Sequence, residues 1–396
     1  MNAPHSAATQ AQRTHPCITA DHEMLRDTIR RFIAERVLPQ ADQWEEDGCV
    51  PRHILRDMGE LGLFGIRYPE EYGGSALDTL STVVLADELG RSSYGGFAVT
   101  VLVHTDMASP HLYHAGTAAQ KAKYLPDLIA GKKIAAVAMT EADAGSDLAS
   151  MRTTAKRVTS ADGDHYVLNG SKMYITNGVH GDVYFVAAKT GAPGRNHQVS
   201  MFIVEKGTPG FRVARPLKKH GWLSSDTAEL VFEDCRIPAA NLLGEENKGF
   251  YALMKNLQNE RIVLGAQAMG EASRAIEITL DWVTQRKAFG ATLWGKQTIR
   301  HRLAELAARV EAVKALIINT AWRDTQGHNA TKEVSMIKAL AGELVNEVMY
   351  ACVQFHGGAG YIRESAIERM ARDARVQSIG GGATEVMLEE IAKRMV

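Results

Sequence analysis

The chain has 396 residues, which is long enough for roughly two or three domains with a sizeable hydrophobic core. Its 45 lysines and arginines nearly balance its 46 aspartates and glutamates, so electrostatics give no reason to expect a nucleic-acid or membrane-surface partner. The four cysteines lie far apart, without the spacing of metal ligands, and predict free thiols, no metal site and a reducing compartment. No apolar stretch reaches the length of about 18 residues that a membrane-spanning helix needs.

The first twenty residues predict a disordered tail. The stretch MNAPHSAATQAQRTHP has no apolar segment of the kind that a secretory signal contains. It is rich in Ala, Ser and Thr and poor in acids, which leaves a mitochondrial presequence open as an alternative. We expect a cytoplasmic bacterial protein, and a mitochondrial matrix location only if this tail is a presequence.

Residues 21–132 are expected to form a helical domain. Asp21 has the character of an N-cap, and apolar residues then recur at spacings of three and four (Leu25, Ile29, Phe32, Ile33) until Pro39. Further helical stretches are predicted at about 52–62, 78–90, 96–115 and 117–130.

The periodicity then changes twice. Over residues 133–243 it falls to two, with β-branched and aromatic runs separated by turns such as Asn-Gly, which predicts an antiparallel β domain. Over residues 244–396 the helical period returns in four or five long stretches separated by short loops, which predicts a helical bundle. The fold class is therefore α+β, with three consecutive domains.

Four segments have the composition of binding loops or surfaces. AMTEADAGSDLAS (138–150) is a glycine-containing polar turn whose backbone N–H groups and hydroxyls suit phosphate or a ring, or is an ordinary polar loop. It contains neither GxGxxG nor GxxxxGK(S/T), so a Rossmann or P-loop site is not supported. In KMYITNG (172–178), alternation puts Tyr174 and Thr176 on one face, beside a planar cofactor or in ordinary core. QFHGGAGYIRE (354–364) and IGGGATE (379–385) place glycines before helices, and His356 is expected to be structural.

Taken together, these segments resemble the signature segments of the acyl-CoA dehydrogenase family. AMTEADAGSDLAS and QFHGGAGYIRESAIERMARD occur in the order and at the separation typical of that family, and GSKMYITN, QRKAFGATLWGKQTI and NLQNERIVLG are also similar to it. The resemblance covers Asp21 to Met395. It implies an N-terminal helical domain, a middle antiparallel β-barrel domain and a C-terminal four-helix bundle. It also implies bound FAD and a homotetramer built as a dimer of dimers.

The resemblance also implies which residues contact FAD. From the same chain these are Met139, Thr140, Ser146, Tyr174 and Thr176. From a neighbouring subunit they are Arg286, Phe289, Gln297, Gln354 and Gly358. A guanidinium can bridge the pyrophosphate dianion, which suits Arg286. Ala288 replaces a residue that is Thr in some members, so one hydroxyl contact is missing here.

Glu260 is the expected catalytic base. It lies on the apolar stripe of Leu257 and Leu264, where a surface ion pair with Arg261 would be the ordinary alternative. Many members of the family place the base in the turn that reads GGGA here, with Gly381 at the base position. The long-chain and isovaleryl-CoA branches place it on the helix, where Glu260 matches. The resemblance further implies that Ser146 and Arg261 face the substrate and that the Gly381 backbone N–H binds the thioester oxygen.

The leading functional prediction is FAD-dependent oxidation of a medium-chain, long-chain or branched acyl-CoA to the trans-2-enoyl-CoA. Its electrons would pass to an electron-transfer flavoprotein, as in fatty acid β-oxidation. The alternatives on this fold are an acyl-CoA oxidase, a nitroalkane oxidase or a flavin monooxygenase. A non-catalytic DNA-binding relative is a further alternative, but such proteins carry an extra basic C-terminal region, whereas this chain ends after its last predicted helix.

Overall fold

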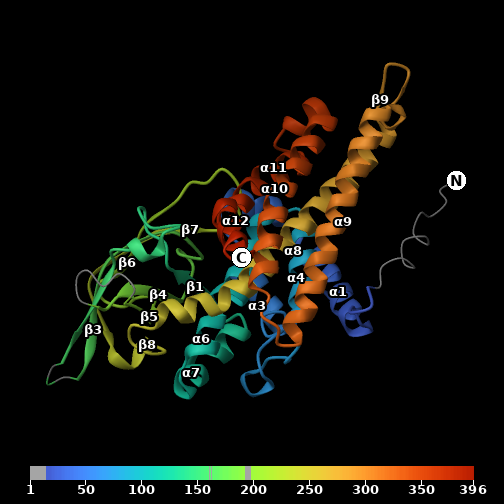
Figure 1. Cartoon of the computed structure of the whole chain (residues 1–396). Helices are drawn as coiled ribbons and strands as arrows, with labels where there is room; N and C mark the ends of the chain where they lie inside the picture. Colours follow the sequence, from blue (N-terminus) through green and yellow to red (C-terminus); the bar gives the residue numbers. More distant parts are fainter. Residues whose placement is uncertain (1–14, 160, 162, 192–197) are drawn as a thin grey trace.

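The computed structural model describes residues 15–159, 161, 163–191 and 198–396 (Figure 1). Most of the predicted tail therefore lies outside the described residues. The first helix, α1 (Ala20–Phe32), is capped by Thr19, so the predicted N-cap at Asp21 is wrong. The Thr19 N–H donates to His22 Nδ1 at 3.1 Å, and Asp21 lies inside the first turn, where a negative charge favours the helix dipole.

The N-terminal domain consists of helices, two of which continue into π-helical segments. After α1 the chain forms a π-helix at Ile33–Val37, and α5 (Gly95–Leu102) continues through a second one, η3 (Val103–Ala108), into α6 (Ser109–Ala115). The remaining helices are α2 (Ala41–Asp47), α3 (Arg52–Glu60), a 3-10 turn at Glu70–Tyr72, α4 (Thr79–Arg91) and α7 (Ala118–Ile129).

The middle domain is an eight-stranded sheet in the described residues, in the order β6-β7-β3-β2-β4-β5-β8, with β1 paired to β4. Most neighbours are antiparallel as predicted, but β1 and β2 each pair with β4 in parallel. The strands are β1 (Ala135–Ala138), β2 (Thr154–Val158), β3 (His165–Thr176), β4 (Val183–Lys189), β5 (Val199–Glu205), β6 (Phe211–Pro216), β7 (Thr227–Pro238) and β8 (Leu242–Leu243). The inward-facing aromatic and aliphatic side chains of β3, β4, β5 and β7 form one buried cluster.

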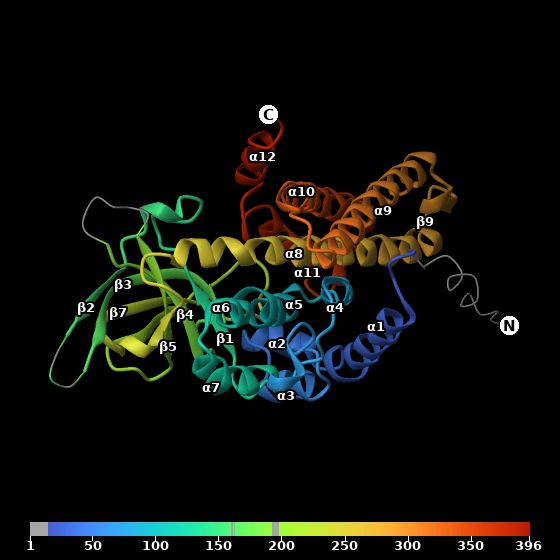
Figure 2. The same cartoon turned by 60° about the horizontal axis from the view of Figure 1, so that its bottom comes forward.

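The C-terminal domain is built on one long helix, α8 (Gly249–Gln285). Figure 2 shows α8 running from the sheet to a small hairpin at the opposite end of the molecule. Packed against it are α9 (Gln297–Thr325), α10 (Thr331–His356) and α11 (Ala366–Ala374), and α12 (Thr384–Ala392) packs against α10. The hairpin between α8 and α9 is β9 (Lys287–Ala288) and β10 (Ala291–Thr292).

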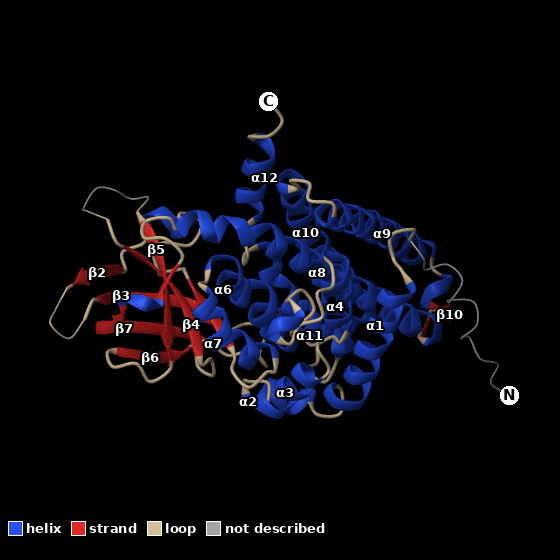
Figure 3. Cartoon of the chain, turned by 90° about the horizontal axis from the view of Figure 1, so that it is seen from below, coloured by secondary structure: helices blue, strands red, loops and turns tan. Residues whose placement is uncertain are grey.

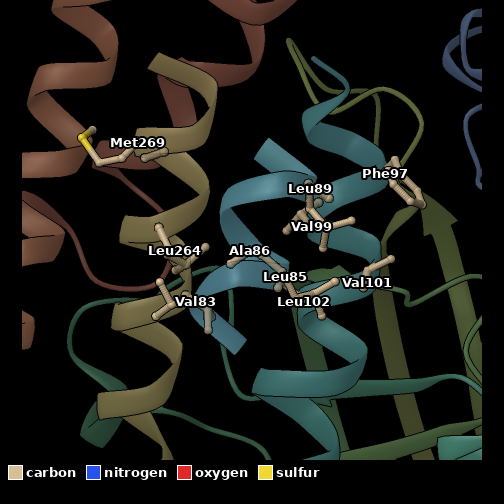
Figure 4. Close-up of a cluster of buried hydrophobic side chains, with 14 of the residues drawn as sticks. Val83, Leu85, Ala86, Leu89, Phe97, Val99, Val101, Leu102, Leu264 and Met269 are labelled. Atoms are coloured by element: carbon tan, nitrogen blue, oxygen red, sulfur yellow. The ribbon is translucent and has the colours of Figure 1, made fainter. Parts of the chain in front are cut away.

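The helical domains share one hydrophobic core. Figure 4 shows side chains of α4, α5 and α8 meeting in it: Val83, Leu85, Ala86, Leu89, Phe97, Val99, Val101, Leu102, Leu264 and Met269. Within the described part of the chain, no helix is both long and apolar enough to cross a membrane. Figure 3 shows the strands of the large sheet gathered at one side of this helical body and the short hairpin of β9 and β10 at the other.

Asp373 joins the three domains at one point. This α11 carboxylate accepts the N–H of Gly95, at the start of α5, at 3.0 Å, and also accepts the N–H of Trp222 from the middle domain. Burial, with the charge of Glu45, raises the pKa of Asp373 to about 7. One side chain of the bundle is therefore hydrogen-bonded to both other domains.

Candidate active site

Glu260 is buried, with 4% of its surface exposed, as its place on the apolar stripe predicts. It lies on α8 opposite η3 and α6. Burial, with a smaller contribution from the charge of Asp106, raises the pKa of Glu260 to about 7. A hydrogen bond from Asn256 and the charge of Arg261 act in the opposite direction. A surface ion pair with Arg261 is therefore not the environment of this carboxyl, which is poised to change protonation near neutral pH.

A polar network that the sequence did not reveal surrounds Glu260. Asn256 Nδ2 donates to Glu260 Oε1 at 3.1 Å and to the Asp106 carbonyl at 2.9 Å. Asn259 Nδ2 donates to the Asp106 carboxylate at 3.1 Å, and Thr105 Oγ1 donates to the same carboxylate at 2.6 Å. The sequence shows both asparagines close to Glu260, but it does not show their partner, Asp106, which lies in a π-helical segment about 150 residues earlier. Such segments occur often at functional sites because they redirect side chains.

Gly381 lies beside the same helix. A Cβ placed on Gly381 would come within 2.2 Å of Leu264 Cδ1, and Leu264 is one turn beyond Glu260 on the same face. The residue has a φ of +67°, a conformation that glycine adopts without strain. The structure thus brings the two predicted catalytic positions, Glu260 and the Gly381 turn, to one place.

A buried lysine holds that turn, and a buried arginine lies beside it. Lys338 Nζ, from α10, donates to the Gln377 carbonyl at 2.6 Å and the Gly382 carbonyl at 3.1 Å. Arg261 is 6% exposed, and its Nε lies 4.0 Å from the Cβ position of Gly382. Burial, with a smaller contribution from the charge of Arg261, lowers the pKa of Lys338 to about 8. Lys338 was not identified from the sequence, where it reads as an ordinary helical lysine.

The loop that carries Met139, Thr140 and Ser146 is fixed by a buried ion pair. Lys172 Nζ donates to Glu141 Oε1 at 2.8 Å and to the Met139 carbonyl at 3.0 Å. The Glu141 carboxylate also accepts the backbone N–H groups of Arg152 (2.6 Å) and Thr153 (3.0 Å). Thr140 Oγ1 in turn donates to the Met173 carbonyl at 2.6 Å. The loop therefore has a defined shape against β3, although it has little regular secondary structure.

Tyr174 and Thr176 lie at an irregular part of β3. The pairing with β7 shifts register between Lys172 and Ile175, and Tyr174 has a φ of +64°. Regular alternation, which the sequence predicted, would give Lys172 and Tyr174 the same environment. Instead Lys172 is fully buried, whereas the Tyr174 ring is 65% exposed and Thr176 is half-buried. The bulge re-aims the ring because one extra residue on β3 breaks the two-residue period.

The other five predicted cofactor residues lie elsewhere. They are at the end of α8 and its hairpin, and at the neighbouring end of α10: Arg286, Phe289, Gln297, Gln354 and Gly358. All five are exposed, Phe289 by 96%. Figure 1 shows β9 far from the sheet that carries Tyr174, so one chain does not bring the two sets together.

Trp282 and His356 bind the two helix ends to each other. Their rings stack at 5.1 Å, and Trp282 Nε1 donates to the Phe355 carbonyl at 3.2 Å. His356 Nδ1 contacts the Cys352 carbonyl at 2.9 Å, which is the structural role expected for this histidine. The Arg286 guanidinium lies 5.9 Å from the Trp282 ring. The five exposed residues therefore form one surface at this end of the bundle.

Comparison with known proteins assigns the family. Residues 19–132, 136–235 and 247–396 match the N-terminal, middle and C-terminal domains of acyl-CoA dehydrogenases. The chain is 42% identical to the mitochondrial long-chain specific acyl-CoA dehydrogenase of Mus musculus, over 96% of this chain and 87% of that protein. It is 36% identical to the mitochondrial isovaleryl-CoA dehydrogenase of Pongo abelii, over 97% of this chain and 92% of that protein.

Solved structures agree with this assignment. The acyl-CoA dehydrogenase from Geobacillus kaustophilus is 39% identical, with a TM-score of 0.91 over 96% of this chain and all of that chain. An acyl-CoA dehydrogenase from Bacillus anthracis complexed with FAD is 34% identical, with a TM-score of 0.87 over 96% of this chain and 68% of that chain. The chain therefore belongs to the acyl-CoA dehydrogenase family and is an oxidoreductase that acts on CH–CH bonds.

Proposed function

We propose that this enzyme oxidises medium-chain, long-chain or branched acyl-CoA thioesters to trans-2-enoyl-CoA, with Glu260 as the base. The observation that carries the proposal is a buried carboxyl with a pKa of about 7 beside a glycine turn, 379–384, that contains no acid of its own. A general base works best when its pKa lies near the working pH, because it is then both ionised and basic. Glu260 meets that condition through burial.

The residues around Glu260 then have distinct tasks. The Glu260 carboxylate removes a proton from the α carbon of the acyl group. The Gly381 backbone N–H donates to the thioester oxygen, which stabilises negative charge there and makes the α proton more acidic. Arg261 and Ser146 contact the CoA side of the substrate. Lys338 keeps the turn in place through the carbonyls of Gln377 and Gly382.

FAD is the cofactor, and when bound it would supply the acceptor for the hydride that leaves the β carbon. The side chains fit its parts: the exposed Tyr174 ring suits the isoalloxazine, and the Thr140 and Ser146 hydroxyls suit its polar edge. The fit extends to a second surface, because Arg286 is exposed and makes no ion pair within the described residues, as a pyrophosphate ligand requires. The exposed Phe289 ring beside it suits an apolar part of the same cofactor.

A second copy of the chain completes each site. β9, which follows Arg286, lies at the far end of the molecule from β3, which carries Tyr174, so one chain does not bring both residues to a single FAD (Figure 1). A Cβ on Gly357 or Gly358 would meet nothing within 4 Å, which leaves room for a ligand to approach the backbone there. We therefore place Arg286, Phe289, Gln297, Gln354 and Gly358 on the FAD of an adjacent subunit, within a homotetramer arranged as a dimer of dimers. The electrons leave to an electron-transfer flavoprotein.

The test is flavin reduction under anaerobic conditions, followed by absorbance after mixing with acyl-CoA thioesters of different length and branching. Glu260→Gln should slow reduction about 10²–10⁴-fold, because a positioned base is lost. In the wild type, kcat/KM should rise with pH through about 7, since only ionised Glu260 accepts the proton.

Glu271→Gln is the matched control. Glu271 is a second buried carboxyl on α8, and burial raises its pKa to about 8, so it is mostly neutral at pH 7. An amide should replace it with little change in rate. If the Glu260→Gln variant reduces its flavin at the wild-type rate, or if both variants lose the same amount of activity, the base lies elsewhere.

A further inference from the structure

His111 is a buried histidine beside the base, and its side chain differs from the other buried histidines. It lies on α6 with 1% of its surface exposed, and its Nε2 is 3.9 Å from Glu260 Oε1. Neither of its ring nitrogens has a hydrogen-bond partner among the described residues. By contrast, His104 uses both ring nitrogens, and His356 bonds to a backbone carbonyl.

The protonation state of His111 follows from its surroundings. Burial, with a smaller contribution from the charge of His114, lowers the pKa of His111 to about 4, so the imidazole is neutral at pH 7. A neutral imidazole carries one N–H donor and one acceptor nitrogen. A buried N–H without an acceptor is unfavourable, and the group that Nε2 faces is the Glu260 carboxylate.

The two carboxylate oxygens of Glu260 are not equivalent. Oε1 accepts from Asn256 Nδ2 at 3.1 Å, and it is also the oxygen that His111 approaches. Both polar neighbours therefore lie at one oxygen, which leaves Oε2 for the substrate. The separation of 3.9 Å exceeds hydrogen-bond length, but hydrogen bonds at active sites often shorten only when substrate is bound.

We propose that His111 is a positioning residue for the base, donating from Nε2 to Oε1 of ionised Glu260 so that Oε2 takes the α proton. This inference rests on the proposed role of Glu260. The proton moves from the substrate carbon to Oε2, and His111 neither gains nor loses one. Its effect is to favour the ionised carboxylate and to fix which oxygen points at the substrate, as outer partners orient reactive groups in many sites.

Other charged groups surround this pair and must be separated from His111. From η3, the charge of Asp106 raises the pKa of Glu260, whereas Arg261, on α8 itself, lowers it. Burial raises the pKa of Asp106 as well, so the pH profile must distinguish this second carboxyl from Glu260. Three charged groups act at one remove, on His111 or Arg261: His114 from α6, and Glu390 and Arg394 from the α12 end. Arg261 in turn lowers the pKa of Lys338, on α10.

The test compares His111→Phe, which keeps a ring but removes the donor, with His111→Gln, which keeps an N–H donor. The readout is the limiting rate of anaerobic flavin reduction between pH 5 and 9, with flavin content and thermal melting checked for each protein. A hydrogen bond to a charged group favours the ionised form, so His111→Phe should move the acid limb upward by about one pH unit. The limiting rate of flavin reduction at pH 6 should therefore fall about tenfold, whereas the plateau rate at high pH should not change. His111→Gln should restore most of the shift.

Further variants make the result decisive. Asp106→Asn should move the limb to lower pH, since its charge raises the pKa of Glu260; a limb that disappears would belong to Asp106 and overturn the proposal. If His111→Phe does not fold, His111→Leu replaces it. The positioning role is refuted if the acid limb of the pH profile does not move in His111→Phe, or if it moves equally in both His111 variants. The assignment of Glu260 as the base is unaffected by either result. If the Glu260→Gln variant instead reduces its flavin at the wild-type rate, Glu260 is not the base, and the positioning role of His111 is refuted as well.

Discussion

A glutamate in the glycine turn is expected to replace Glu260 as the catalytic base when three residues are changed together. The perturbation is Glu260→Gly with Gly381→Glu, combined with Leu264→Ala. The third change is dictated by the structure, because a Cβ on Gly381 would lie 2.2 Å from Leu264 Cδ1, whereas ordinary contacts are 3.4–4 Å. A glutamate at 381 therefore points toward Leu264, one turn from the site that Glu260 vacates, and needs that space.

The energetic terms can be ranked. A side chain at a φ of +67° is strained by about 1–2 kcal/mol. Overlap with the Leu264 methyl adds about 1–3 kcal/mol for repacking. Gly381→Ala alone should therefore lower the free energy of unfolding by about 2–5 kcal/mol. Gly380→Ala is the matched control, because its Cβ would meet its nearest neighbour at 3.7 Å and its φ is not positive.

The assay is anaerobic flavin reduction by a panel of acyl-CoA thioesters. The triple variant should reduce its flavin at least about tenfold faster than Glu260→Gly with Leu264→Ala, since a base contributes about 10²–10⁴-fold. The variant that keeps Leu264 should be slower or less stable than the triple variant. If the triple variant binds FAD and melts normally but gains no activity, the Gly381 turn does not face the α carbon.

Two further predictions concern the cofactor. Arg286→Ala should weaken FAD binding and loosen the oligomer together, because a ligand shared between chains favours the assembled state; sedimentation with and without FAD measures both, and Arg212→Ala, an exposed arginine on β6, is the control. An unchanged flavin content and oligomer size would show that Arg286 is only a surface residue. Lys172→Met should lower thermal stability and flavin retention, because removing one partner of a buried ion pair costs about 3–5 kcal/mol. Lys172→Met combined with Glu141→Gln should recover part of the stability, and full flavin retention in the single variant would contradict a role for the pair in shaping the loop.

The helices that the sequence predicted well have strong local signals. Stretches at 52–62, 78–90 and 117–130 correspond to α3, α4 and α7. Asp78 caps α4 by accepting the Ser81 N–H, and Thr117 and Gln120 form a capping box at α7. Such signals involve residues three or four positions apart, so one sequence is enough to read them.

The parts of the site that were missed depend on distant partners. The stretch 96–115 reads as one helix, but its centre is π-helical. Residues 96–112 are all buried, so the sequence has no one-sided apolar stripe whose shift would reveal the extra residue. Asp106 and His111 are turned toward α8 by that segment. In the same way, Lys172 pairs with Glu141 across 31 residues, and no local pattern links them. The burial of Glu260 was predictable because its own helix carries the apolar stripe.

The position of the base on α8 explains how a polar cluster can be held without disrupting the fold. Asn256, Asn259 and Glu260 are buried in the first third of α8, and buried polar groups oppose stability unless they are paired. The following turns, from Ile262 to Ala275, are buried in the shared apolar core. Those turns anchor the helix, so a carboxyl in an unfavourable environment keeps one orientation. A flexible loop would let the same carboxyl move out toward water, and its pKa would return toward its usual value. A base on a long buried helix is therefore kept both basic and aimed by the apolar residues that follow it.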